Sequence, residues 1–158
     1  MGRAFFSLLL LIFLAGQAFS QIRSVKIQDF NYRRFEGSAL SLQIKASYFE
    51  KQPDESFSAK NLELVSPKKG INIKSKLGFY EKKKELFHFR GTVELKTDKH
   101  GDIFTEELFY SVKEGVLRAP GRVLIKKDGM LLEGSELYYN LTTGEFSLKG
   151  KVKAKFSL

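Results

Sequence analysis

A repeat of about thirty residues constrains the fold of this chain more than any other feature. Three Gly-x-Val triplets recur at spacings of 30 and 29 residues: Gly91-Thr92-Val93, Gly121-Arg122-Val123 and Gly150-Lys151-Val152. A tyrosine recurs at the same spacings, and an apolar residue stands four positions before each glycine: Tyr80, Tyr110 and Tyr139; Phe87, Leu117 and Phe146. Each unit reads as a hairpin, and a hairpin cannot bury its apolar face alone, so neighbouring units must stack.

Apolar and polar residues alternate through the rest of the chain, with no convincing helical period. This alternation, interrupted by glycine-containing turns, predicts nine strands: 24–30, 39–49, 57–65, 70–80, 85–96, 102–112, 115–127, 130–140 and 145–157. Asp128-Gly129 is a strong signal for a two-residue hairpin turn. Pro120 lies inside a predicted strand, which predicts a local bulge or an amide that faces away from the ladder.

The pattern predicts an all-β fold: a single folded-over antiparallel sheet, a β-jellyroll or V-shaped groove, of about nine or more strands with hairpin repeats. Because no helix is predicted to cover the apolar face, the sheet must roll onto itself. We expect Gly91, Gly121 and Gly150 to share an inward position. Glycine there would let the sheet bend sharply, and the missing side chains would also widen an apolar cavity; the two interpretations are compatible.

Residues 1–20 are expected to be a targeting segment, and residues 21–158 a single domain. Arg3 precedes an apolar run over residues 4–16, and Ala18-Phe19-Ser20 places small residues where a signal peptidase requires them. The run is shorter than the about 20 residues of a spanning helix. This favours a cleaved secretory signal, with an uncleaved inner-membrane anchor as the alternative. In either case the rest of the chain crosses a membrane.

Composition excludes several classes of function. The chain has no cysteine, which excludes a disulfide scaffold, a cysteine nucleophile and thiolate metal sites. It has two histidines and no visible triad, carboxylate pair or phosphate loop, so we expect no enzyme activity, no metal and no cofactor. The net charge of +9 suggests an anionic partner. We expect no nucleic acid, because the chain is exported and its aromatic residues alternate inward.

The inward face supplies the candidate residues of an apolar, lipid-binding groove: Phe87, Phe89, Val93, Leu95, Leu117, Val123, Ile125, Phe146, Leu148 and Val152. The alternative is that they form an ordinary sandwich core. The last strand ends without a capping element and is a candidate partner edge: Lys149, Lys151, Lys153, Lys155 and Phe156. Such an edge can bind another protein by strand addition, although lysines on an edge strand also protect against unwanted pairing.

The order and spacing of several segments resemble the LptC family, the periplasmic component of the lipopolysaccharide-export ABC transporter. The resemblance covers nearly the whole chain, and its segments, besides the Gly-x-Val copies, are these: Phe30-Asn31-Tyr32-Arg33-Arg34-Phe35-Glu36-Gly37, Leu40-Ser41-Leu42-Gln43-Ile44-Lys45-Ala46, Asn61-Leu62-Glu63-Leu64, Gly101-Asp102-Ile103-Phe104-Thr105-Glu106-Glu107-Leu108-Phe109-Tyr110 and Leu131-Leu132-Glu133-Gly134-Ser135-Glu136-Leu137-Tyr138-Tyr139-Asn140. The related LptA and OstA proteins share the repeat. Tyr32-Arg33-Arg34-Phe35 and the single-domain size favour LptC, whereas a cleavable signal favours LptA.

The resemblance implies a transport function. It implies that lipopolysaccharide acyl chains ride in the apolar interior, passed from the inner-membrane ABC transporter to an LptA-like periplasmic bridge protein for outer-membrane assembly. The N-terminal part would meet the transporter and the C-terminal edge the bridge protein, in the periplasm, with the N-terminal segment attached to the inner membrane or cleaved. A soluble LptA-like bridge and a structural or adhesive surface repeat protein remain alternatives. A carrier needs an open groove, whereas a structural repeat has a packed interior.

Overall fold

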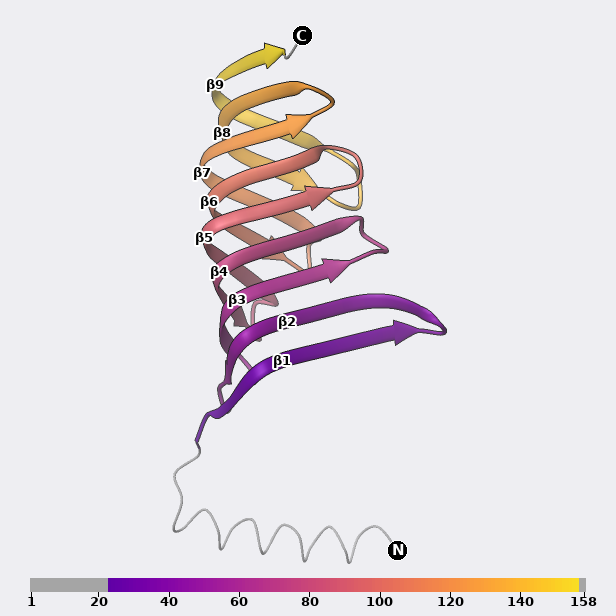
Figure 1. The fold of residues 1–158 in the computed structure, drawn as a ribbon, viewed down its shortest axis with the longest axis vertical. Coiled ribbons are helices and arrows are strands. Elements are labelled where there is room, and N and C mark those ends of the chain that lie inside the picture. Colours follow the sequence, from indigo (N-terminus) through magenta and orange to yellow (C-terminus); the bar gives the residue numbers. More distant parts are fainter. Residues whose placement is uncertain (1–22, 157–158) are drawn as a thin grey trace, which may run out of the picture.

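The computed structural model describes residues 23–156, and these form one antiparallel sheet whose nine strands lie in chain order. The strands are β1 (Val25–Glu36), β2 (Ala39–Lys51), β3 (Phe57–Ser66), β4 (Ile71–Glu81), β5 (Leu86–Thr97), β6 (Gly101–Ser111), β7 (Val116–Lys127), β8 (Met130–Asn140) and β9 (Phe146–Phe156). They stack along the long axis of the molecule from β1 to β9 (Figure 1). The predicted all-β fold and its hairpin order are confirmed.

The first strand is longer than predicted, because β1 ends at Glu36 and not at residue 30. Phe30 pairs with Ala46, and pairing continues through a register shift after Arg34 to the tight turn at Gly37. Almost every residue of β1 is exposed, so the strand lacks the alternation of a half-buried strand. Its pairing partner β2, rather than its own pattern, makes this segment extended.

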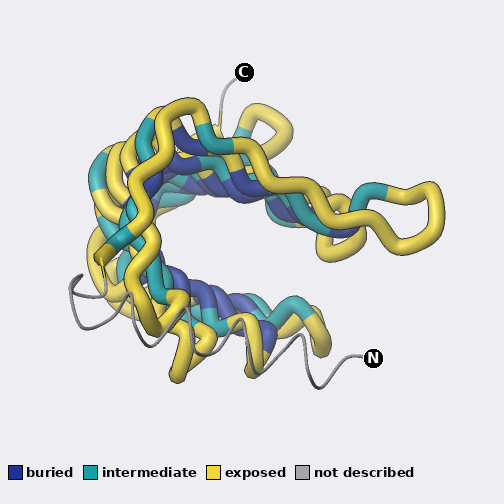
Figure 2. The backbone as a smooth tube through the Cα atoms, turned by 90° about the horizontal axis from the view of Figure 1, so that it is seen from below, coloured by how far each residue is buried: buried dark blue, intermediate teal, exposed yellow. Residues whose placement is uncertain are grey.

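The sheet is folded over into two facing leaves, and the buried residues lie where the leaves face each other (Figure 2). These buried residues form one apolar cluster. We call one half the aliphatic leaf; it ends at the turns 37–38, 67–70, 98–100 and 128–129. We call the other half the aromatic leaf; it ends at the turns 52–56, 82–85, 112–115 and 141–145. Each strand runs through both leaves, so the fold line crosses the strands near their middle.

Pairing breaks down along this fold line. The register shifts between Lys74 and Leu77 in β4, between Arg90 and Val93 in β5, and after Ala119 in β7. Similar shifts interrupt β6 and β8, and Asn61 of β3 has a positive φ at the corresponding place. Bulges bend a strand and increase its twist, so a line of them folds the whole sheet. The irregularity predicted at Pro120 is confirmed as part of this line.

The repeated glycines act in the bend, and the expectation that they face an inner cavity is wrong. A Cβ on Gly91 would meet the exposed Lys76 side chain at 3.2 Å, and one on Gly121 would meet nothing within 4 Å. Gly150 has a φ of +87, and a Cβ there would collide with the Ser135 side chain. The physical reason is that a bulge rotates the residue out of the regular alternation, so parity along the strand no longer predicts its direction.

No helix within residues 23–156 has the length and apolar character needed to cross a bilayer. The segment 1–20, predicted to be a signal or an anchor, lies outside the described residues.

Candidate functional site

The inner surface of the folded sheet is built from two register rows with different side chains. The aliphatic leaf carries a row that runs from β2 to β9: Ile44, Leu64, Ile73, Leu95, Ile103, Ile125, Leu132 and Ala154. The aromatic leaf carries a row that runs from β3 to β9 and that we call the aromatic rim: Phe57, Tyr80, Phe87, Tyr110, Leu117, Tyr139 and Phe146. Aromatic and β-branched pairs across neighbouring strands stabilise a sheet. In this fold the two rows also face each other across the interior.

The aromatic rim accounts for the tyrosine repeat found in the sequence. Tyr80 pairs with Phe87, Tyr110 with Leu117 and Tyr139 with Phe146, each across the turn that follows the tyrosine. The Tyr80 and Phe87 rings lie with their centroids 4.5 Å apart. Sequence reasoning found the period but left the tyrosines out of the candidate groove. The signal that would have placed them there is their constant spacing: each tyrosine stands seven residues before the inward Phe87, Leu117 or Phe146, on the other side of one turn.

The structure brings all ten predicted groove residues to the inner surface. Those of β5 and β7 are buried: Phe87, Phe89, Val93, Leu95, Leu117, Val123 and Ile125. In β9, Phe146 and Leu148 are half-buried and Val152 is 50% exposed.

The middle of the interior is closed by the protein's own side chains. Phe89, Leu95 and Ile103 have no exposed surface, and Phe87 stacks on Phe89 with centroids 5.8 Å apart. A hollow of 640 Å³ lies instead at the bend, lined by polar residues such as Asn61 and Lys74 together with the apolar Phe30, Ala46 and Leu62. The middle of the interior, around Phe89, therefore corresponds to the packed interior expected of a structural repeat.

The two ends of the stack are open. At the β9 end, Val152 is 50% and Phe156 73% exposed, and Leu132 beside them is half-buried. At the β1 end, Phe30 stacks on Phe49 at 4.0 Å but stays half-buried, and Phe35 is exposed. The apolar inner surface therefore reaches solvent at each end of the sheet, although it is sealed between them.

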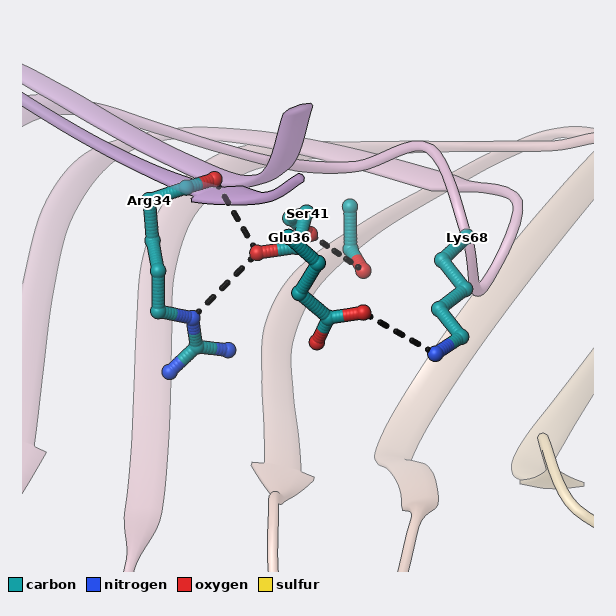
Figure 3. A network of polar contacts seen from close by, with 5 residues as sticks. Arg34, Glu36, Ser41 and Lys68 are labelled. Carbon is teal, nitrogen blue, oxygen red and sulfur yellow. Dashed lines mark hydrogen bonds and ion pairs between the residues drawn. The ribbon is translucent and has the colours of Figure 1, made fainter. Parts of the chain in front are cut away.

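The β1–β2 hairpin is tied to the neighbouring turn by a small polar network (Figure 3). The Ser41 hydroxyl donates to the Arg34 carbonyl at 3.0 Å, and Lys68 Nζ lies 3.1 Å from Glu36 Oε2. All these contacts join elements of the aliphatic leaf. They hold the edge hairpin in place without using its apolar side chains.

Side chains also join the two leaves across the mouth opposite the bend. Lys69 Nζ, in the turn between β3 and β4, donates to the Tyr110 hydroxyl of the aromatic rim at 3.1 Å. His100, in the turn between β5 and β6, stacks on Phe146 with centroids 4.2 Å apart and meets Tyr139 edge-on at 4.8 Å. Neither Lys69 nor His100 was singled out from the sequence, because each stands in a turn and meets its partner through tertiary contact alone.

The electrostatic surroundings of the second contact shift two pKa values. Burial lowers the pKa of His100 below its usual value, and the charges of Lys127 and Lys99 lower it further. Burial raises the pKa of Tyr139, and Asp98 adds to the effect. Both groups are therefore held in their neutral forms at neutral pH.

The predicted partner edge is exposed along its length. Lys149, Lys151, Lys153, Lys155 and Phe156 are all exposed on β9. Lys153 pairs with Glu133 and Phe156 with Met130 on β8, while the other edge of β9 has no strand beside it in the described part of the chain. β1 forms the opposite free edge. Strand addition is thus geometrically available at both ends of the stack.

Comparison with known proteins gives one family and one fold. The family model described as "Lipopolysaccharide-assembly, LptC-related" matches residues 19–157. No curated protein matches the sequence significantly. Among solved structures, the chain is similar to LptH from Pseudomonas aeruginosa, described as the LptA-homologous periplasmic component of the lipopolysaccharide transport device. The TM-score is 0.60 at 10% identity, over 74% of this chain and 95% of that chain. At that identity the likeness shows a shared fold.

Proposed function

The chain belongs to the LptC-related family of lipopolysaccharide-assembly proteins, and from that premise we propose that it holds lipopolysaccharide by its acyl chains between the two leaves and passes it onward. Membership makes the chain a component of lipopolysaccharide transport and not an enzyme. The observation that carries the proposal is the shape of the inner surface. One continuous apolar surface runs from β2 to β9 and is open at both ends.

The chemistry of this surface suits an amphiphile. Each acyl CH₂ transferred from water contributes roughly 0.8 kcal/mol, so a chain of about 12 carbons contributes on the order of 9 kcal/mol before binding costs. An exposed ion pair contributes about 0–1 kcal/mol. The apolar interior would therefore set the affinity, while the cationic exterior would orient the phosphates.

The packed middle of the interior is compatible with a carrier because the leaves are joined differently on their two sides. At the bend the chain itself joins them. At the mouth, within the described residues, no strand pairing links the two leaves, and side chains such as Lys69 and His100 make the contact. An entering acyl chain replaces apolar contacts between leaves with apolar contacts to itself, so little is lost inside while the lipid leaves water.

The two free edges offer one docking place at each end of the stack, and the direction of passage is taken from the resemblance to the LptC family. We place the inner-membrane transporter at the β1 end and an LptA-like bridge protein at the β9 edge, where Phe156 and the lysines of β9 are exposed. The chain would act in the periplasm, attached through its N-terminal segment. A soluble LptA-like bridge is the second candidate, since the structural likeness is to LptH.

Photo-crosslinking tests the proposal. A photoreactive residue is placed at Phe89 in the interior, at Val152 at the open end, and, as a matched control, at Phe79, which is 37% exposed and pairs with His88 on the outer surface. Transfer of label to lipopolysaccharide from Phe89 and Val152, but not from Phe79, is expected. Label that stays within the protein at all three positions would refute the carrier and leave the structural repeat. Retention of Met1 or Gly2 in the membrane fraction, as opposed to a chain that starts at Gln21, separates the anchored from the soluble form.

A further inference from the structure

The mouth between the leaves has a second role if the proposed function holds, and this inference rests on it. A lipid whose acyl chains lie inside must keep its sugar and phosphate headgroup outside, since burying charged groups without partners is very costly. The neck between chains and headgroup must then pass through the mouth. Movement from β1 to β9 requires the mouth to be open along the whole path.

Two contacts obstruct that path, and they occupy equivalent positions of the repeat. Lys69 and His100 are 31 residues apart in turns of the aliphatic leaf, and their rim partners Tyr110 and Tyr139 are 29 residues apart. Each turn reaches a strand three to four places beyond the strand that it follows: the turn after β3 contacts β6, and the turn after β5 contacts β8 and β9. The two contacts are therefore copies of one device with different chemistry.

Lys68, which precedes Lys69 in the same turn, shows by contrast what is specific about Lys69. Lys68 Nζ pairs with Glu36 inside the aliphatic leaf at 3.1 Å, whereas Lys69 Nζ crosses the mouth to the buried Tyr110. Tyr80 stands one repeat earlier on the rim and, in the described residues, has no hydrogen bond across the mouth. The molecule therefore contains both the crossing contacts and unclasped equivalents beside them.

We propose that Lys69–Tyr110 and His100–Tyr139–Phe146 are two successive clasps that close the mouth, and that each must release for a lipid to pass along the interior. The clasps make the buried middle of the groove accessible only while the leaves separate. The open β9 end, with Val152 exposed, stays accessible whether or not the clasps are shut.

A covalent lock tests the first clasp. The chain has no cysteine, so Lys69→Cys with Tyr110→Cys can be joined by a short bismaleimide without side reactions. The photoreactive residue is then placed at Phe89, beneath the clasped region, or at Val152. With lipopolysaccharide as the probe, the lock is expected to abolish labelling from Phe89 and to leave labelling from Val152 unchanged. Equal labelling from Phe89 in locked and unlocked protein would overturn the clasp while the proposed function stands.

Absence of labelling from both positions in the unlocked protein is a different outcome. It overturns the proposed function and, with it, the need for a clasp.

Single substitutions provide the opposite perturbation. Lys69→Met removes the charged donor, and the rate of labelling from Phe89 is expected to rise about tenfold, the effect of losing one hydrogen bond to a charged group. The matched controls are Lys68→Met, which breaks a pair within one leaf, and Tyr80→Phe, which alters an unclasped rim tyrosine. An equal acceleration by Lys68→Met would show general loosening of the turn and would refute the assignment.

The leaf separation can be measured without lipid, which keeps the test independent of transport. Spin labels on Lys96→Cys in the aliphatic leaf and Lys113→Cys in the turn after β6 report the distance between the leaf tips. Lys69→Met is expected to lengthen and broaden that distance, with unchanged circular dichroism. A distribution identical to that of the unsubstituted pair would contradict the clasp.

Discussion

The packed state of the interior makes a sharp prediction at Gly78, a buried glycine of β4. A Cβ at this position would lie 2.1 Å from Leu62 Cδ2 and 3.1 Å from both Cβ and Cγ of Leu62. Carbon atoms prefer separations of about 3.5–4.0 Å, so the Leu62 methyl group must move by roughly 1.5 Å. Leu62 is only 1% exposed and has no solvent to move into. Overpacking of this kind costs about 1–3 kcal/mol.

Gly121 provides the matched control for Gly78→Ala. It lies in β7 at the bend, it has nothing within 4 Å of an added Cβ, and its φ is not positive. Gly121→Ala is therefore expected to be neutral or to stabilise the fold by about 0.4–1 kcal/mol through the unfolded state.

Urea denaturation followed by circular dichroism measures both variants. Gly78→Ala should lower the midpoint, and a thermal scan should show a fall of about 4 °C for each kcal/mol lost. If Gly78→Ala is as stable as the parent, the interior holds a void beside Leu62 and is neither packed nor clasped shut. If Gly121→Ala is the damaging variant, the glycines of the bend face the interior after all.

Three further predictions follow from the interior, the mouth and the edge. Phe89→Ala should cost about 3–5 kcal/mol in urea denaturation, because the ring is fully buried; a cost below about 1 kcal/mol would mean that the leaves are already apart. Since the pKa of His100 is lowered in the folded chain, its contribution to stability is complete above the unfolded value of 6.5 and is lost as the pH falls below it. Acid should therefore loosen the second clasp, where Tyr139 and Phe146 contact the imidazole, Lys127 and Lys99 act on it, and Asp98 acts on Tyr139. The spin-label distance should lengthen below pH 6.5 in the parent and in His88→Gln, but not in His100→Gln. The double variant Val152→Lys with Phe156→Lys should keep its free energy of unfolding within about 0.5 kcal/mol of the parent's, since both side chains are largely exposed. It should weaken co-purification with an LptA-like partner. Unchanged co-purification would place the partner elsewhere.

The strands were predictable from the sequence because each half-buried strand carries its own alternation, as Phe87 to Leu95 does in β5. The bend was not, because a bulge breaks the rule that places every second residue on one face. Gly150 shows the failure: counted from Phe146 it should point inward, whereas its missing side chain faces Ser135. The predicted first strand ends at residue 30 and not at Glu36 for a related reason. An exposed edge strand buries few side chains, so its sequence shows little alternation.

The candidate site was predictable as a set of inward residues but not as a closed interior. Alternation identifies which side chains face inward, and all ten candidates do. It carries no information about the distance between the leaves, which depends on the angle of the bend. The clasps could not be predicted from the sequence for the same reason. Lys69 and Tyr110 are 41 residues apart and meet only once the sheet is folded over.

The offset between the leaves explains why the β9 end stays open. The turns that carry Lys69 and His100 meet the aromatic rim three to four strands beyond the strand that each turn follows, at β6 for Lys69 and at β8 and β9 for His100. The next turn, at Asp128-Gly129 between β7 and β8, would by the same offset meet strands beyond β9, and the described part of the chain has none. The aliphatic leaf therefore lacks an opposing rim at this end, and Val152 and Phe156 remain exposed. Strands added to β9 by a partner would continue the rim, cover these side chains and oppose that turn at once, so the apolar surface of one unit would be completed by the next.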